Sequence, residues 1–435
     1  EYIISATNDD MSAEKFAVYR KRSKVCFPQP CSHLEAYSGF IPVDESSTTY
    51  LFFLHIKSEN SSSRKPLLLW LPHTLGMSSL FSQFLGNGPL GIDANGKLYR
   101  RSNSLLRKFN VIYLDQPAGS GYSFDEQKRY PRTLDQASIQ VLRFLRRFLR
   151  IFIEYKNRDF YIAGESYGAR SAVGVAFSII ATKGGPVPIK LKGVMLGAGF
   201  LFPLMDIIDS AHFLHESSLL DEYGKKTLLG WFQMIREAAK RKNYTVAAAD
   251  LYKAVMNMPP AGWITVFQTL TGFKYHGSTI RSRQPLQVRE YFEYANSEDF
   301  KRVIHVGSSM VLDSTRRDVA MEIAEHDFFI NIERKVKRVF ENTRVLFYTA
   351  QADAVFPATN LQSSLRNLDW TWRDSLNTAR QKPWYKDDNS SLELLGYETK
   401  IGKFTYVKLN RAGHEISLDE PEAVHEMYSR FLKTT

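Results

Sequence analysis

Short, continuous apolar runs recur along the chain and predict the strands of a buried sheet. They lie at residues 66–71, 110–114, 160–163, 191–196, 344–348 and 404–409. Runs of this length suit strands that are covered on both faces of a largely parallel sheet. Residues 49–56 alternate weakly and predict a further strand. An amphipathic stretch at residues 133–155 predicts a helix between two of the runs, so the pattern indicates an α/β sandwich.

The middle of the chain has a different pattern. Residues 203–340 are mainly helical in character, and the stretches at 221–242 and 319–341 are amphipathic. Within this segment, residues 303–306 are a candidate strand. The short apolar runs resume after it, so the sheet finishes beyond an insertion. The predicted parts are a first core part at 1–202, an inserted helical cap at 203–340 and a second core part at 341–435.

Composition and charge exclude several classes of protein. With 44% hydrophobic and 24% charged residues, the chain has an ordinary globular composition, and disorder is not indicated. No apolar run approaches the roughly 18 to 20 residues that span a bilayer, so no membrane span is expected. The net charge of +11 is dispersed, and the densest basic cluster is Arg143, Arg146, Arg147 and Arg150. Because leucines interleave at helical spacing, a solvated helix face is favoured over a polyanion site, and no nucleic-acid partner is expected.

Three features bear on the cellular compartment. The two cysteines, Cys26 and Cys31, are close enough in sequence to close a short disulfide loop in an oxidising environment. The chain begins at Glu1 rather than Met, which fits a removed leader or a trimmed end. Sequons for N-linked glycosylation occur at Asn60, Asn243 and Asn389. Together these features predict a secreted or endolysosomal protein.

A candidate nucleophile lies on a sharp turn near the middle of the chain. The five residues Gly164-Glu165-Ser166-Tyr167-Gly168 match the pattern G-x-S-x-G. They follow the apolar run at 160–163 and precede a small-residue stretch at 169–180 that predicts a helix. A serine on such a turn projects its hydroxyl into a cleft, and the glycines remove Cβ atoms that would clash. A glycine-rich connecting turn is the alternative, but the context favours a nucleophilic Ser166.

The chain also offers a base and an acid in a suitable order. A serine nucleophile needs a base to take its proton and a carboxylate to orient that base. Asp353 follows one late predicted strand and His414 follows the other, so both lie beyond the carboxyl ends of strands, where ligands bind. The order Ser, Asp, His is that of α/β-hydrolases. A turn-capping aspartate and a structural histidine are the alternatives. No metal or cofactor is predicted, because His212 and His215 have no convincing third ligand nearby.

Several blocks, spread over most of the chain, fit one family. They are residues 66–71 with Gly76, Ser78 and Ser79; Asn87-Gly88-Pro89; residues 110–123; Gly164-Glu165-Ser166-Tyr167; Gln351-Ala352-Asp353; and Ala412-Gly413-His414 with Asp419 and Pro421. These blocks resemble the serine carboxypeptidases, especially their vitellogenic-like branch. The resemblance implies an α/β-hydrolase fold, with a mostly parallel sheet, helices on both faces and an inserted helical cap. It also implies a peptide or small acyl substrate and, as in many members, a homodimer.

The resemblance assigns roles to the residues of the candidate site. Ser166 would attack a peptide or ester carbonyl. His414 would act as general base and then as general acid, and Asp353 would hold His414. The oxyanion hole would consist of the backbone N–H groups of Tyr167 and Thr74.

The first signature departs from the family pattern. The family carries N-G-G-P-G-C-S-S where this chain has Pro72-His73-Thr74-Leu75-Gly76-Met77-Ser78-Ser79. Pro72 lacks the asparagine amide that helps to bind the substrate's terminal carboxylate, and Met77 replaces the family's cysteine. Gly86 replaces a glutamate that usually shares a proton with the glutamate beside the nucleophile, here Glu165. Glu165 and His73 remain the candidates for binding substrate. His73 could supply positive charge at low pH, although a histidine on a surface loop is the favoured alternative.

These observations leave three functions open. The leading one is a serine carboxypeptidase-like hydrolase that recognises the substrate carboxylate in an altered way. The second is a catalytically weak or inactive pseudoenzyme that acts as a binding protein; the changed signature favours it and the triad disfavours it. The third is an acyltransferase, in which an alcohol or amine intercepts the acyl-enzyme instead of water.

Overall fold

The chain folds into two compact units. The computed structural model describes residues 13–59, 62–182, 185, 187–256, 263–314, 316–386 and 393–433. Unit 1 comprises Glu1–Met195 and Pro285–Val319, and unit 2 comprises Leu196–Gln284 and Ala320–Thr435. The segment 203–340 therefore contributes to both units, and its grouping into one cap stays a prediction.

Unit 1 is built on a mixed sheet whose central strands are parallel. In sheet order the strands are β1 (Lys24–Val25), β2 (Ala36–Pro42), β3 (Thr49–Ile56), β7 (Asn110–Leu114), β4 (Leu67–Leu71), β9 (Asp159–Glu165) and β10 (Lys190–Gly197). β4 pairs in parallel with β7 and β9, whereas β3 is antiparallel to β2 and β7. The strands predicted here from apolar runs are confirmed. Every residue of β3, β4 and β7 is buried, which explains why these strands have continuous apolar sequences.

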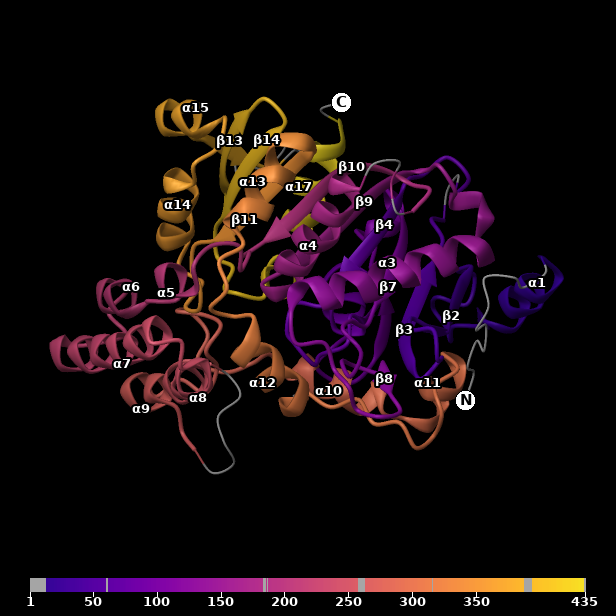
Figure 1. The fold of residues 1–435 in the computed structure, drawn as a ribbon, viewed down its shortest axis with the longest axis horizontal. Helices are drawn as coiled ribbons and strands as arrows, with labels where there is room; N and C mark the ends of the chain where they lie inside the picture. Colours follow the sequence, from indigo (N-terminus) through magenta and orange to yellow (C-terminus); the bar gives the residue numbers. More distant parts are fainter. Residues whose placement is uncertain are drawn as a thin grey trace. The chain divides into compact units, whose positions relative to one another are not determined.

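Two long helices pack on the sheet of unit 1. These are α3 (Leu134–Ile151) and α4 (Tyr167–Ala181), which contact each other and strands β2, β4 and β9 (Figure 1). The two helices approach closely at Gly174, where a Cβ atom would lie 2.6 Å from Oγ of Ser138. The remaining elements of unit 1 are α1 (Ala13–Arg22), α2 (Leu80–Ser82), η1 (Gln83–Asn87), η2 (Leu105–Arg107), η3 (Ile153–Tyr155), α10 (Leu286–Ala295), α11 (Glu298–Val303), β5 (Leu90–Ile92), β6 (Leu98–Arg100) and β8 (Phe124–Asp125).

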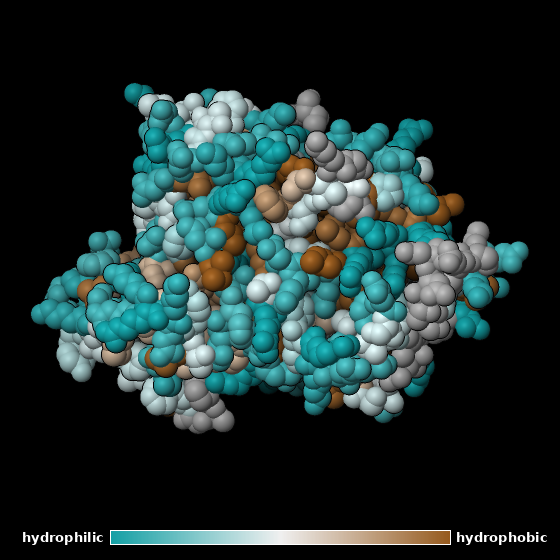
Figure 2. Space-filling view, viewed as in Figure 1, coloured by the Kyte–Doolittle hydropathy of each residue, from teal (hydrophilic) through white to brown (hydrophobic). Residues whose placement is uncertain are grey.

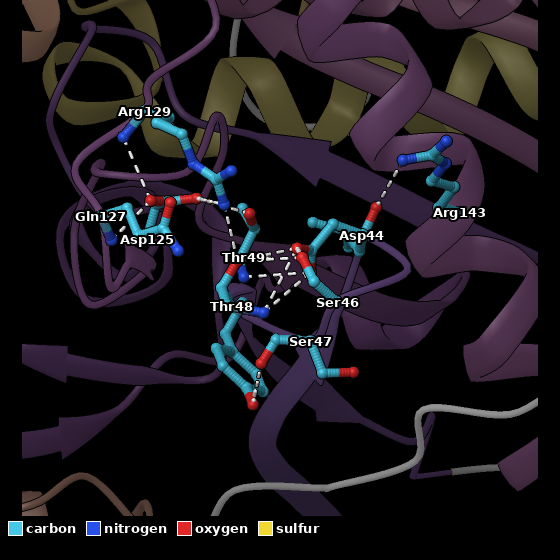
Figure 3. Close-up of polar contacts among 11 residues, drawn as sticks. Asp44, Ser46, Ser47, Thr48, Thr49, Asp125, Gln127, Arg129 and Arg143 are labelled. Atoms are coloured by element: carbon cyan, nitrogen blue, oxygen red, sulfur yellow. Dashed lines mark hydrogen bonds and ion pairs between the residues drawn. The ribbon is translucent and has the colours of Figure 1, made fainter.

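The basic face of α3 is partly engaged with the rest of unit 1. Arg143 donates a hydrogen bond to the carbonyl oxygen of Val43, and Arg147 donates to that of Pro42, at the turn between β2 and β3. Asp44 holds the same turn by accepting from the backbone N–H groups of Thr48 and Thr49 (Figure 3). Although burial opposes it, this set of hydrogen bonds lowers the pKa of Asp44 to about 2. Arg143 and Arg146 are exposed, as the predicted solvated face requires, whereas Arg147 and Arg150 are half-buried.

Unit 2 contains a second set of paired strands. Their order is β11 (Arg344–Ala350), β14 (Phe404–Leu409), β13 (Leu394–Ile401) and β12 (Lys382–Tyr385). β11 and β14 are parallel, as predicted for the continuous apolar runs, whereas β13 and β12 are added antiparallel. β12 and β13 were not predicted from the sequence, because exposed and half-buried positions interrupt their apolar pattern.

The helices of the middle segment correct two predictions. The stretch at 319–341 is not one helix but two, α12 (Arg317–His326) and α13 (Glu333–Asn342). Residues 303–306 are not a strand, since α11 ends at Val303 and a turn follows. The other helices are α5 (Leu204–Ile207), α6 (Ala211–Glu216), α7 (Glu222–Lys240), α8 (Tyr244–Ala254), α9 (Val266–Thr271), α14 (Ala358–Asn367), α15 (Arg373–Thr378), α16 (Ile416–Asp419) and α17 (Pro421–Lys433).

The predicted disulfide is absent. Cys26 and Cys31 are both free; Cys26 is exposed and Cys31 is buried, with its Sγ 3.9 Å from the carbonyl oxygen of Pro89. The physical reason is the alternation of side chains around Cys26: its neighbours Val25 and Phe27 are buried, so the Cys26 side chain faces the other way. The prediction of a short disulfide loop is thus wrong.

The surface offers one described glycosylation candidate. Asn243 is exposed at the start of α8, and its side chain accepts a hydrogen bond from the N–H of Val246. The sequons at Asn60 and Asn389 lie outside the described residues. The face drawn in Figure 2 carries mainly hydrophilic side chains, with smaller hydrophobic groups between them. Among the helices described, none is long and apolar enough to cross a membrane.

Candidate active site

Ser166 occupies a strained turn between a strand and a helix. β9 ends at Glu165 and α4 begins at Tyr167, and Ser166 between them has φ 54° and ψ −119°. Residues other than glycine rarely adopt such angles, at a strain of about 1–3 kcal/mol, and they do so mainly at functional sites. The turn thus presents the serine in the way expected of a nucleophile.

The two glycines of the motif are required by close backbone packing. A Cβ atom at Gly164 would lie 2.4 Å from the carbonyl carbon of Gly168. A Cβ atom at Gly168 would lie 2.6 Å from the carbonyl oxygen of Pro72 and 2.7 Å from that of Leu71. Because no backbone atom can shift that far cheaply, the predicted steric role of these glycines is confirmed. The start of α4 therefore lies directly against the end of β4.

Unit 2 brings Asp353 and His414 together. Asp353 lies just after β11 and His414 just after β14, and these strands are parallel neighbours. The distance between Nδ1 of His414 and Oδ2 of Asp353 is 2.9 Å. The other carboxylate oxygen, Oδ1, accepts from the backbone N–H groups of Val355 and Phe356 at 2.8 and 2.9 Å. Asp353 is fully buried, so this carboxylate is held in one orientation.

This pairing defines the chemistry of the imidazole. A carboxylate can only accept hydrogen bonds, so Nδ1 of His414 carries the proton that it donates to Asp353. Nε2 is then the basic nitrogen, which is the tautomer that a general base needs. The backbone N–H of His414 donates to the carbonyl oxygen of Gly277 at 2.7 Å, and its ring meets that of Phe356 edge-on at 5.1 Å. Packing and hydrogen bonds thus fix both the tautomer and the ring plane.

A second buried carboxylate supports the histidine loop. Oδ2 of Asp419 accepts from the N–H of Gly413 at 2.7 Å, and Oδ1 lies 2.9 Å from a guanidinium nitrogen of Arg281. Burial raises the pKa of Asp419 to about 6, against the opposing effects of the Gly413 N–H and Arg281. Sequence reasoning missed Arg281 and Gly277, since no motif surrounds them and only folding brings them to the histidine.

The loop that carries the altered signature is anchored to Asp115. This carboxylate is fully buried and accepts from the hydroxyl and N–H of Ser79, from the hydroxyl of Ser78 and from the N–H of Tyr122, at 2.7 to 2.9 Å. Burial raises the pKa of Asp115 to about 6 although these donors oppose it. Gly121 lies so close that a Cβ atom there would meet Oδ2 of Asp115 at 2.1 Å. The end of the signature loop, at Ser78 and Ser79, is thus fixed by its hydrogen bonds to Asp115.

The N–H of Tyr167, a predicted oxyanion donor, already donates a hydrogen bond within the chain. It donates to the carbonyl oxygen of His73 at 3.1 Å. Because a trans peptide is planar, its N–H and C=O groups point in opposite directions, so the N–H of Thr74 is directed away from Tyr167. The side chain of His73 is buried, and its ring lies 5.3 Å from that of Phe81. The alternative of a surface-loop histidine is therefore excluded.

The residues around the expected carboxylate site are also buried. Glu165 is only 3% exposed, and Gly86 lies within η1. Asn87 accepts from the hydroxyl of Tyr113 at 3.0 Å, whereas its Nδ2 has no hydrogen-bond partner among the residues that the structure describes. A substrate role for Glu165 stays a prediction.

Metal-ligating side chains do not gather in the described part of the chain, where no group of three or more His, Cys, Asp or Glu residues could hold an ion. His215, on α6, lies 3.1 Å from a carboxylate oxygen of Glu222.

Comparisons with known proteins agree with the geometry. The family described as "Serine carboxypeptidase" matches residues 27–434. A human protein described as "Probable serine carboxypeptidase CPVL" is 28% identical over 407 residues, which cover 93% of this chain and 84% of that protein. The "Vitellogenic carboxypeptidase" of Aedes aegypti is 27% identical over 414 residues, covering 95% and 86%.

A solved structure shows the same architecture. The fold matches that of a prohormone-processing carboxypeptidase, Kex1(delta)p of Saccharomyces cerevisiae, with a TM-score of 0.76 and 17% identity, over 95% of this chain and 96% of that one. This likeness shows the α/β-hydrolase fold with its mostly parallel sheet, as predicted. Since the family match extends over nearly the whole chain, the protein belongs to the serine carboxypeptidase family.

Proposed function

We propose that this protein hydrolyses peptides, esters or amides through an acyl-enzyme on Ser166, with His414 as base and Asp353 as the carboxylate that orients it. The proposal is carried by the buried 2.9 Å hydrogen bond between Asp353 and His414, in a chain that also holds Ser166 on a strained turn. Membership of the serine carboxypeptidase family supports the same chemistry.

The proposed reaction has two halves. Oγ of Ser166 attacks the substrate carbonyl carbon while Nε2 of His414 takes the hydroxyl proton. The tetrahedral intermediate collapses, the bond to the leaving group breaks, and the departing amine or alcohol takes the proton from His414. Water then attacks the acyl-enzyme in the same way, which releases the acid and restores the Ser166 hydroxyl. Asp353 stabilises the imidazolium in both halves.

We further propose that the substrate does not need a free terminal carboxylate. Pro72 offers no amide N–H, and Gly86 offers no carboxyl group to share a proton with Glu165. Both changes remove groups that the family uses for that carboxylate. The values of kcat/KM for a blocked dipeptide acid, its amide and its ester should therefore be comparable, or should favour the ester. A strong preference for the free acid at ordinary rates would refute this altered recognition.

A fluorophosphonate probe tests the nucleophile directly. Such probes phosphonylate an activated serine and expel fluoride, so labelling reports the serine and its base together. We expect the wild-type protein to be labelled and Ser166→Ala to remain unlabelled. Absence of labelling in the wild type, or equal labelling of Ser166→Ala, would refute the proposed chemistry.

One observation favours a second function, a catalytically weak or inactive protein that binds ligands. The N–H of Tyr167 donates to the His73 carbonyl oxygen at 3.1 Å, so this oxyanion donor already has an acceptor within the chain. Loss of one oxyanion donor typically lowers the rate about 10²–10³-fold. A protein of this kind would bind a peptide without measurable product formation, and its serine would label slowly or not at all.

A further inference from the structure

We infer that Thr74 holds the oxyanion hole closed, because its side chain keeps the His73–Thr74 peptide turned with its carbonyl oxygen on the N–H of Tyr167. This inference rests on the proposed function, since an oxyanion hole has meaning only if Ser166 forms a tetrahedral intermediate. It makes Thr74 a positioning residue that sets the rate of turnover.

The N–H of Tyr167, one of the two expected oxyanion donors, is already occupied. The N–H of Tyr167 is the first amide of α4, and the first four amides of a helix have no partner within it. The carbonyl oxygen of His73 satisfies this amide at 3.1 Å. An oxyanion cannot approach the same N–H while that oxygen is in place, and the two negatively polarised oxygens would repel each other.

The other expected oxyanion donor, the N–H of Thr74, is directed away from Tyr167. Opening the hole requires the His73–Thr74 peptide to rotate by about half a turn, which would move the carbonyl away and bring the N–H of Thr74 round. Such a flip changes ψ of the first residue and φ of the second residue. Neither His73 nor Thr74, both within the described residues, has a positive φ angle in this structure. The flipped form would therefore give Thr74 a positive φ.

A positive φ angle is costly at Thr74. A positive φ is readily adopted by glycine but is a genuine outlier for a β-branched residue. The family has glycine where this chain has Thr74, so the substitution removes the freedom that the flip requires. His73 changes only ψ, which most residues tolerate over a wide range. The decisive side chain is thus that of Thr74 rather than the imidazole of its neighbour.

The residues on both sides of the His73–Thr74 peptide are held in place by other contacts. The carbonyl oxygen of Thr74 accepts from the N–H of Met77 at 3.1 Å. The N–H of Gly76 donates to Oγ of Ser120 at 3.2 Å, and its carbonyl oxygen accepts from the N–H of Gly121 at 3.0 Å. On the other side, Pro72 lies against Gly168. Because both flanks are fixed, rotation of the single peptide is the available route to an open hole.

The test compares two substitutions of the half-buried Thr74. Thr74→Gly permits the flip, whereas Thr74→Val keeps the shape and the β-branching. We expect Thr74→Gly to raise the fluorophosphonate labelling rate and kcat for an ester about 10²-fold, with KM changed much less, because one oxyanion donor contributes about 10²–10³ in rate. Thr74→Val should show less than one tenth of that gain. Equal rates for the two variants would overturn the inference.

The outcomes separate this inference from the proposed function. If neither the wild type nor either variant is labelled, the acyl-enzyme chemistry itself is wrong. If all three are labelled at the same rate, Ser166 is activated and only the role of Thr74 is wrong. A wild type that is labelled, together with a Thr74→Gly variant that is labelled faster, supports both.

A measurement on the wild-type protein guards against a variant that does not fold. Amide hydrogen exchange should show the Tyr167 N–H protected in the ligand-free protein, because it donates to His73. A peptidyl boronic acid, which mimics the tetrahedral intermediate, should bind more tightly to Thr74→Gly than to the wild type. Rapid exchange of the Tyr167 amide in the free wild type would overturn the inference.

Discussion

Asp353→Asn gives the sharpest test of the proposed catalytic pair. In the wild type, Oδ1 of Asp353 accepts from the backbone N–H groups of Val355 and Phe356. An asparagine at this position must place its carbonyl oxygen there, since an NH₂ group would face two donors. Its NH₂ group then occupies the place of Oδ2, which lies 2.9 Å from Nδ1 of His414. The substitution therefore sets a donor against the nitrogen that normally donates.

The imidazole relieves this conflict most directly by a change of tautomer, since its other contact with residue 353, from Nδ1 to Oδ1, is longer at 3.1 Å. The proton moves from Nδ1 to Nε2, so that Nδ1 of His414 accepts from the new amide. Nε2 can then no longer take the proton of Ser166. In serine proteases the corresponding change of tautomer lowers kcat about 10⁴-fold, or about 5 kcal/mol in activation free energy. We expect a loss of that size in Asp353→Asn, with little change in stability because the new side chain fills the same space.

The assay is the ester turnover rate together with the fluorophosphonate labelling rate. Asp374→Asn is the matched control: its side chain is 95% exposed, and it should behave as the wild type does. Urea unfolding of each variant would separate a loss of chemistry from a loss of folded protein. The reasoning is refuted if a folded Asp353→Asn retains more than one tenth of the wild-type rate.

Three further predictions concern the scaffold of the site. Gly168→Ala should lower the free energy of unfolding in urea by about 1–3 kcal/mol and abolish fluorophosphonate labelling. The reason is that its Cβ would lie 2.6 Å from the Pro72 carbonyl oxygen. A variant with the stability and labelling of the wild type would contradict this. Burial raises the pKa of Asp115 from 3.8 to about 6. The folded state therefore keeps this proton to a higher pH than the unfolded state does, so the free energy of unfolding should fall by about 2 kcal/mol as the pH rises from 4 to 7. Asp115→Asn should make the free energy of unfolding less dependent on pH between about pH 4 and 7. An unchanged pH dependence would contradict this prediction. Arg147→Ala should reduce the free energy of unfolding by about 1–3 kcal/mol, since Arg147 donates to the Pro42 and Asp44 carbonyls; a change below the error of urea titration would show that the bond contributes nothing.

Local patterns were sufficient for the strands and for the nucleophile turn. A strand buried on both faces needs a continuous apolar run, so β4, β7 and β9 could be predicted directly. The turn at Ser166 could be predicted because its steric demand falls on residues of the same short segment, Gly164 and Gly168. A prediction failed where the helical spacing of apolar residues continues although the helix itself ends. The stretch at 319–341 keeps this spacing throughout, but α12 ends at His326 and α13 follows as a separate helix.

The amino-acid order alone therefore established the family, the succession of strands and helices and the identity of the candidate serine, acid and base. Folding was needed to show that Asp353 and His414, 61 residues apart, lie at hydrogen-bond distance, since their approach depends on the parallel pairing of β11 with β14. It was also needed for the contact between His73 and Tyr167. A peptide can rotate without any change in the pattern of polar and apolar side chains, so no reading of residue types could reveal which way that carbonyl points.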